Sequence, residues 1–122
     1  MKLVTVSGVE EIGGYVDSLK EKHVSIDNLF YDKHKMRLSF TVKAALAERL
    51  INVEMMMDVS KVSVVGVGLY GRTEILSRIF SELLRERIEV CMVDCSDTRI
   101  SIAVAQENTD MALNLLHDAF IG

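Results

Sequence analysis

The chain has 122 residues, a formal net charge of −4, 49% hydrophobic residues and 26% charged residues. This composition is typical of a globular domain and argues against a disordered chain, and without basic runs it gives no sign of a nucleic-acid surface. No apolar stretch approaches the roughly 20 residues that cross a bilayer, and acidic residues follow the N-terminal apolar stretch at once, unlike in a signal peptide. We therefore expect no nucleic-acid or membrane partner. Two cysteines, Cys91 and Cys95, form no disulfide framework and favour a reducing, cytoplasmic location.

The sequence contains two related halves. The sequence of residues 4–9 is similar to that of residues 62–67, and the sequence of residues 37–42 is similar to that of residues 99–104. The spacing between the copies grows along the chain, so the first copy is several residues shorter between its opening strand and its first helix. Such self-similarity indicates two copies of one supersecondary unit. We expect the first unit at residues 1–58 and the second at 59–122.

The first half reads strand, helix, strand, strand, helix, strand. Its expected elements are a strand at 2–6, a helix carrying Ile12, Tyr15, Val16 and Leu19, strands near 24–29 and 37–42, a short helix at 44–51 and a strand at 52–57. A polar turn is expected at 31–35. Gly13 and Gly14 would each cost the first helix about 1 kcal/mol.

The second half repeats this order. Its expected elements are a strand at 61–67, a helix with Ile75, Ile79, Leu83 and Leu84 on its buried face, strands at 88–93 and 99–105, and a helix at 109–120. Thr73 is the expected N-cap of the first helix, and Met111, Leu115 and Ala119 mark the expected buried stripe of the last one.

The second half contains no counterpart of the strand at 52–57, which leaves one sheet edge open. Open edges recruit further strands, so we expect a dimer or a piece of a longer chain. The predicted fold class is α+β, with two ferredoxin-like βαββαβ units packed side by side, joined by a linker at 58–60, and the second lacking its last strand.

Residues 66–71 form a literal G-x-G-x-x-G after a predicted strand, and Glu89 lies at the distance expected for a ribose-binding acid. However, the strand at 88–93 runs into another strand rather than into further βα crossovers. A glycine-permissive turn is therefore the preferred interpretation, with nucleotide binding as a minor alternative.

No catalytic constellation stands out. The histidines (His23, His34 and His117) have no cysteine or carboxylate at metal-ligand spacing. Cys91 has no basic neighbour in the sequence and is interpreted as a structural thiol. The sequence therefore predicts no metal, no cofactor and no enzymatic activity.

Several segments of the second half carry a family resemblance. Residues 61–69 read Lys-Val-Ser-Val-Val-Gly-Val-Gly-Leu, and they are followed by Arg-Ile-Phe at 78–80, Ile-Glu-Val at 88–90, Arg-Ile-Ser-Ile at 99–102 and Leu-His-Asp-Ala-Phe at 116–120. This pattern resembles the second ACT module in the regulatory region of aspartokinases. Residues 1–58 are similar, less closely, to the first module of the same region.

The resemblance implies a tandem of ACT modules that binds an amino-acid effector, most simply lysine or threonine, and controls lysine, threonine or methionine biosynthesis. The kinase domain is absent, so the expected partners are a second copy and an aspartate kinase catalytic domain or subunit. The effector residues implied in the second module are Leu69, Tyr70, Gly71, Arg72, Thr73, Glu74, Asp94, Cys95, Ser96 and Asp97. Those implied in the first module are Asp27, Asn28, Tyr31 and Asp32.

The first module lacks the usual Asp-x-Pro-Gly sequence, because the shortening falls on that loop, and the second module has Thr73-Glu74 at its Pro-Gly position. The alternative hypothesis is therefore an interaction or dimerisation module that no longer responds to an effector.

Overall fold

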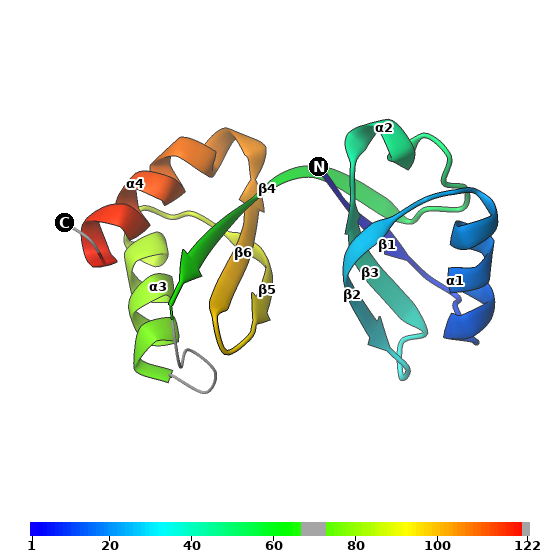
Figure 1. The fold of residues 1–122 in the computed structure, drawn as a ribbon, viewed down its shortest axis with the longest axis horizontal. Coiled ribbons are helices and arrows are strands. Elements are labelled where there is room, and N and C mark those ends of the chain that lie inside the picture. The colour runs from blue at the N-terminus through cyan, green and yellow to red at the C-terminus, as the bar shows by residue number, and fades with distance from the viewer. Residues whose placement is uncertain (67–72, 121–122) are drawn as a thin grey trace. The chain divides into compact units, whose positions relative to one another are not determined.

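The computed structural model describes residues 1–66 and 73–120. The chain divides into two compact units, Met1–Asp58 and Val59–Gly122. Figure 1 shows helices against the strands in each unit. Both units have the strand connections of a ferredoxin-like fold, as the sequence predicted.

The first unit contains four strands in the order β2-β3-β1-β4, and every neighbouring pair is antiparallel. Its elements are β1 (Lys2–Val6), α1 (Ile12–Glu21), β2 (Ile26–Asp32), β3 (Arg37–Val42), α2 (Ala44–Ala47) and the start of β4 (Met55–Val65). The core is formed by Val4, Val6, Val9, Leu19, Val24, Leu38, Phe40, Val42 and Ala47. Alternating apolar residues of β1 and β3 thus point to one face, which α1 covers.

Helix α1 is held at both ends by side chains. The Glu11 carboxylate accepts hydrogen bonds from the backbone N–H groups of Gly13 and Gly14, which satisfies two donors at the helix start. At the other end, the Arg49 guanidinium donates to the carbonyls of Lys22 and His23, at 3.2 and 3.1 Å. Both ends are therefore satisfied within the first unit.

The described residues of the second unit form three strands in the order β4-β6-β5, again antiparallel. Its other elements are α3 (Thr73–Arg85), β5 (Val90–Cys95), β6 (Arg99–Ala105), the 3₁₀ turn η1 (Gln106–Asn108) and α4 (Thr109–Phe120). Residues Val59–Val65 of β4 pair with β6, and among the described residues no strand pairs with their other edge. This is the open edge that the sequence predicted.

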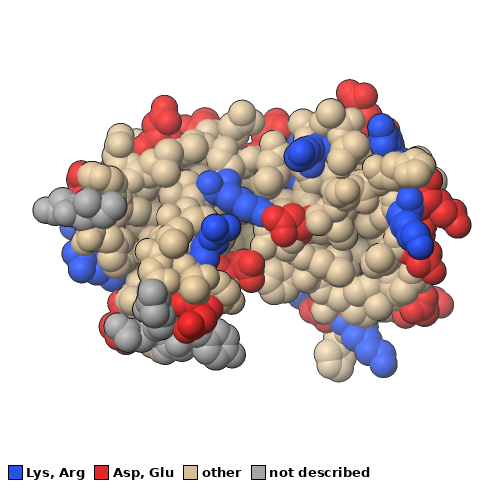
Figure 2. Space-filling view, in the orientation of Figure 1, with Lys and Arg blue, Asp and Glu red and all other residues tan. Residues whose placement is uncertain are grey.

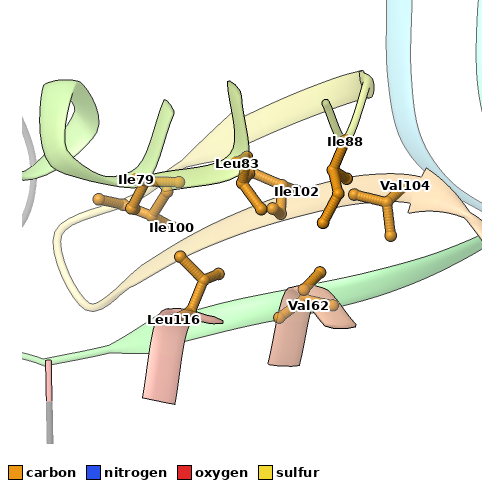
Figure 3. Close-up of a cluster of buried hydrophobic side chains, with 9 residues drawn as sticks. Val62, Ile79, Leu83, Ile88, Ile100, Ile102, Val104 and Leu116 are labelled. Atoms are coloured by element: carbon orange, nitrogen blue, oxygen red, sulfur yellow. The ribbon is translucent and has the colours of Figure 1, made fainter. Parts of the chain in front are cut away.

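The core of the second unit lies between its sheet and its two helices. Its buried members are Val62, Ile79, Leu83, Ile88, Ile100, Ile102, Val104, Ala112 and Leu116. Figure 3 shows Ile79 and Leu83 of α3 pointing toward the side chains of β6. The Arg78 guanidinium lies 5.0 Å from the ring centroid of Phe120 and donates to the Ala119 carbonyl, so α3 also holds the end of α4.

Three sequence predictions at the strand and helix boundaries were wrong. Residues 58–60 are not a linker, because β4 continues from Met55 to Val65 without a break. The helix expected at 44–51 is a single turn, α2. Thr73 is the first residue of α3 rather than its N-cap, while Glu74 lies in the first helical turn as predicted.

Two predictions of buried helix faces were also wrong. Leu84 is 76% exposed, because it lies on the outer flank of α3 and not toward β6. The buried stripe of α4 is formed by Ala112 and Leu116, whereas Met111 is exposed. The buried stripe of α4 is therefore shifted by one residue from the predicted one.

Candidate functional site

The β5–β6 hairpin of the second unit contains four of the predicted effector residues. Asp94 and Cys95 end β5, while Ser96 and Asp97 form the turn that leads to Arg99. The turn is closed by the Ser96 N–H, which donates to the Arg99 carbonyl at 2.7 Å, and Asp97 is exposed. The hairpin therefore presents one fixed turn with a carboxylate at its tip.

A backbone hydrogen bond joins this hairpin to the end of β4. The Gly66 N–H donates to the Thr98 carbonyl at 3.0 Å. Gly66 is the last described residue before the predicted effector loop, of which Leu69, Tyr70, Gly71 and Arg72 lie outside the described residues. The hairpin therefore lies beside the point where that loop begins.

The predicted loop ends at the first turn of α3. Thr73 and Glu74 are both exposed there. The N–H groups of a first helical turn favour a negative charge, and the Glu74 carboxylate supplies one from the chain itself. An effector carboxylate arriving at this turn would meet the same N–H groups together with a like charge.

The four residues predicted in the first unit do not converge on one cavity. The Tyr31 hydroxyl donates to the Val9 carbonyl at 2.6 Å, and Asp32 accepts from the Lys35 N–H at 3.2 Å in the following turn. Asp27 and Asn28 lie at a bulge of β2, where Asn28 has a φ of 51°. There the buried Thr41 hydroxyl donates to the Asp27 carbonyl at 3.0 Å.

The loop between β1 and α1 in the first unit is tied down by its own chain. The Val9 N–H donates to the Met36 carbonyl at 2.8 Å, and the Val9 carbonyl accepts from Tyr31. Val9 itself is buried in the core. Both backbone groups of Val9 are therefore paired internally, and its N–H is already used as a donor.

Hollows lie on the described parts of both units. One of about 260 Å³ includes Asp27, Ser25 and Lys43. One of about 550 Å³ lies between the end of β4 and α4, and its lining is largely apolar. A groove of about 450 Å³ follows one flank of α1. No sequence pattern predicted this groove.

The surroundings of Cys91 disfavour its thiolate form. Burial and the nearby Glu89 carboxylate raise the pKa of the Cys91 thiol, so this thiol is protonated at neutral pH. No group of three or more His, Cys, Asp or Glu within residues 1–66 and 73–120 is arranged to hold a metal ion. Acidic and basic side chains are interspersed over the face shown in Figure 2.

The G-x-G-x-x-G motif falls outside the described residues except for Gly66. The strand that follows α3 is β5, which pairs antiparallel with β6. A dinucleotide-binding fold would instead place a parallel strand beside β4. The topology of the described strands therefore differs from that of a dinucleotide-binding fold.

Comparison with known proteins identifies the second unit. The ACT domain family matches residues 62–120. The second unit is an ACT domain. In Thermus thermophilus, an aspartokinase is 27% identical over 120 residues, which cover 84% of this chain and 30% of that enzyme. An aspartate kinase of Stutzerimonas stutzeri is 33% identical over 63 residues, which cover 52% of this chain and 15% of that enzyme.

A solved structure matches nearly the whole chain. The regulatory subunit of aspartate kinase from Thermus flavus superposes with a TM-score of 0.82 at 25% identity, over 98% of this chain and 92% of that subunit. The chain therefore resembles the regulatory subunit of aspartate kinase, as the sequence predicted, and it spans less than a third of the two aspartokinases above. None of the helices within the described residues is long and apolar enough to cross a membrane.

Proposed function

We propose that this chain is an amino-acid-sensing regulatory part of an aspartate kinase, without catalytic activity of its own. The observation that carries the proposal is the superposition on 92% of a regulatory subunit, which is nearly the whole of that chain. The matched part of the two aspartokinases is likewise only a minor share of each enzyme.

The proposed effector is an amino acid of the aspartate family, with lysine or threonine first. We place its site in the second ACT domain, between the loop at 69–74 and the β5–β6 hairpin. The hydrogen bond from Gly66 to Thr98 supports this placement, because it holds the last described residue before the loop beside the hairpin. Helix N–H groups suit the effector carboxylate, and strand carbonyls with an acidic side chain suit its ammonium group.

The proposed partners are a second copy of this chain and an aspartate kinase catalytic chain or domain. The open edge of β4 supports assembly, because its backbone groups can pair with a further strand. We also propose a cytoplasmic location. The free thiols of Cys91 and Cys95 are consistent with a reducing compartment.

A matched pair of variants tests the site by titration calorimetry with lysine and threonine. Asp94 and Asp32 are acidic residues near the end of the second strand in their respective units. Asp94→Asn should weaken effector binding at least about tenfold, which corresponds to about 1.4 kcal/mol. Asp32→Asn should leave the affinity unchanged. The reverse result would move the site to the first unit.

The second candidate function is an assembly module that has lost its effector. The β1–α1 loop of the first unit favours it, because the Val9 N–H and carbonyl already pair within the chain. Light scattering combined with the same titrations separates the two functions. An assembling chain that binds none of the twenty amino acids would support the second function, and a chain that binds one of them selectively would exclude it.

A further inference from the structure

Strand β4 belongs to both units. Its first four residues pair with β1 in the first unit, and its other seven pair with β6 in the second. The last rung of the first ladder joins Asp58 to Lys2, and the first rung of the second ladder joins the next residue, Val59, to Ala105. Neighbouring residues of β4 thus belong to different ladders, and no residue lies between the ladders to act as a hinge.

The sequence of β4 also lacks residues that favour a bend. None of its 11 residues is glycine or proline, and its second half is rich in valine, which has a high strand propensity. At the junction, Nζ of Lys2 lies 2.6 Å from a carboxylate oxygen of Asp58, and the hydrogen bond from Lys2 lowers the pKa of Asp58. The strand therefore passes from one unit into the other as one continuous element that is held by an ion pair where the ladders meet.

The register of β4 is fixed on both sides of this junction. Val62 is 2% exposed in the core of the second unit, and Met56 lies opposite the fully buried Val4 of the first. Successive side chains of a strand point to opposite faces, so a slip of one residue would turn Val62 out of its core. Because the two halves are continuous, the same slip would also change every pair between β4 and β1. A shift of β4 in one unit must therefore be absorbed by the ladder of the other.

The size of the units decides how strongly they depend on each other. Each unit has its own cluster of buried side chains, and separate cores alone would allow independent unfolding. However, each unit has only roughly 60 residues, a size at which one core gives marginal stability. If the second unit unfolded, Met55–Asp58 would continue into disordered chain and would fray from β1, because strand ends open at little cost in free energy. The first unit would then lose one strand of its sheet.

We propose that β4 couples the two units into one cooperative body, so that neither sheet unfolds without the other. This inference goes beyond the proposed effector, and the coupling itself requires no ligand. It also gives the first unit a part in sensing. β4 ends at Val65, directly before Gly66, where the predicted effector loop begins. An amino acid bound by that loop would therefore stabilise the first unit as well as the second.

Hydrogen exchange of the whole chain, followed by NMR for each amide, tests the coupling. Leu83→Ala removes a side chain that is 1% exposed in the core of the second unit. It should speed exchange of the slowest amides of β6 at least about tenfold, and those of β1 and β3 by the same factor. Coupling is reciprocal, so Leu38→Ala in the first unit should likewise speed the slowest amides of β6. The proposal is overturned if each variant accelerates exchange only in its own unit.

A pair of insertions tests whether β4 carries the coupling. Two glycines inserted between Asp58 and Val59 place a hinge at the junction, and they should either split the single thermal transition into two or unfold the chain. The same insertion between His34 and Lys35 is the matched control, because both residues are exposed in the turn between β2 and β3. It should leave one transition. A junction insertion that leaves the transition unchanged would overturn the proposal.

These measurements are independent of the effector. They use the chain without any amino acid, so a chain that binds no amino acid can still show the coupling, and a chain that binds one can still lack it. Failure of the coupling and failure of the proposed sensing function are therefore distinguishable.

Discussion

The cap at the start of α1 predicts that substitutions of Glu11 and Gly13 have coupled effects on stability. Glycine in a helix costs about 0.5–1 kcal/mol relative to alanine, so Gly13→Ala would ordinarily stabilise the first unit. In this structure a Cβ on Gly13 would lie 2.8 Å from Oε1 of Glu11, the atom that accepts the Gly13 N–H. The new methyl group therefore displaces the capping carboxylate. Loss of such a cap costs about 1 kcal/mol, so the two effects should cancel.

The variant Glu11→Ala separates the gain in helix propensity from the loss of the cap. Glu11→Ala alone should destabilise the chain by about 1 kcal/mol. In that background Gly13→Ala should stabilise by about 0.5–1 kcal/mol, because no carboxylate remains to be displaced. The coupling energy of about 1 kcal/mol is measured by urea unfolding followed by circular dichroism. Additive effects of the two substitutions would refute the capping role of Glu11.

Three further predictions concern the core, the hydrogen bond from Tyr31 to Val9, and the half-buried thiol of Cys91. Leu83→Ala should destabilise by about 2–5 kcal/mol in thermal or urea unfolding, because Leu83 is 1% exposed, and a loss below about 1 kcal/mol would contradict the packing of α3. Tyr31→Phe removes the hydrogen bond to Val9 and should cost about 0.5–1.5 kcal/mol by the same assay; an unchanged stability would argue against a stabilising role of this bond. Because the pKa of Cys91 is raised, a Cys95→Ser variant should react with Ellman's reagent more slowly than free cysteine at about pH 8, with a rate that rises toward higher pH; a faster reaction would contradict the burial of this thiol.

Strong local patterns explain why much of the fold could be predicted. β1 and β3 have the predicted bounds, because Leu38, Phe40 and Val42 alternate with more polar residues and all three are buried. Helix α4 also has its predicted bounds. The spacing of apolar residues within each of these segments is enough to predict it, without knowledge of its tertiary contacts.

Long-range contacts explain most of the differences. Residues 58–60 read as a polar linker, but Asp58 pairs with Lys2 at 2.6 Å and its backbone continues the ladder of β4. Leu84 points outward because α3 packs on β6 through its other side chains. Helical spacing in the sequence does not fix the rotation of the helix about its axis to within one residue.

The predicted site was only partly accessible to sequence reasoning. The resemblance indicated the β5–β6 hairpin and the start of α3, and the hairpin is joined to the end of β4 at Gly66. It did not indicate the hydrogen bond between Tyr31 and Val9, because these residues are 22 positions apart and their contact depends on the tertiary fold. The groove along α1 was not predicted either, because no sequence pattern indicated it.

The most direct test of the central claim is thermal unfolding of the purified chain with each of the twenty amino acids. A ligand at about 100 times its dissociation constant adds about 2.7 kcal/mol if it binds only the folded state. For a domain of this size that corresponds to a shift on the order of 10 °C. We predict a selective shift of this size with lysine, threonine or another amino acid of the aspartate family. A melting temperature that no amino acid changes would contradict a sensing role and leave assembly as the function of the chain.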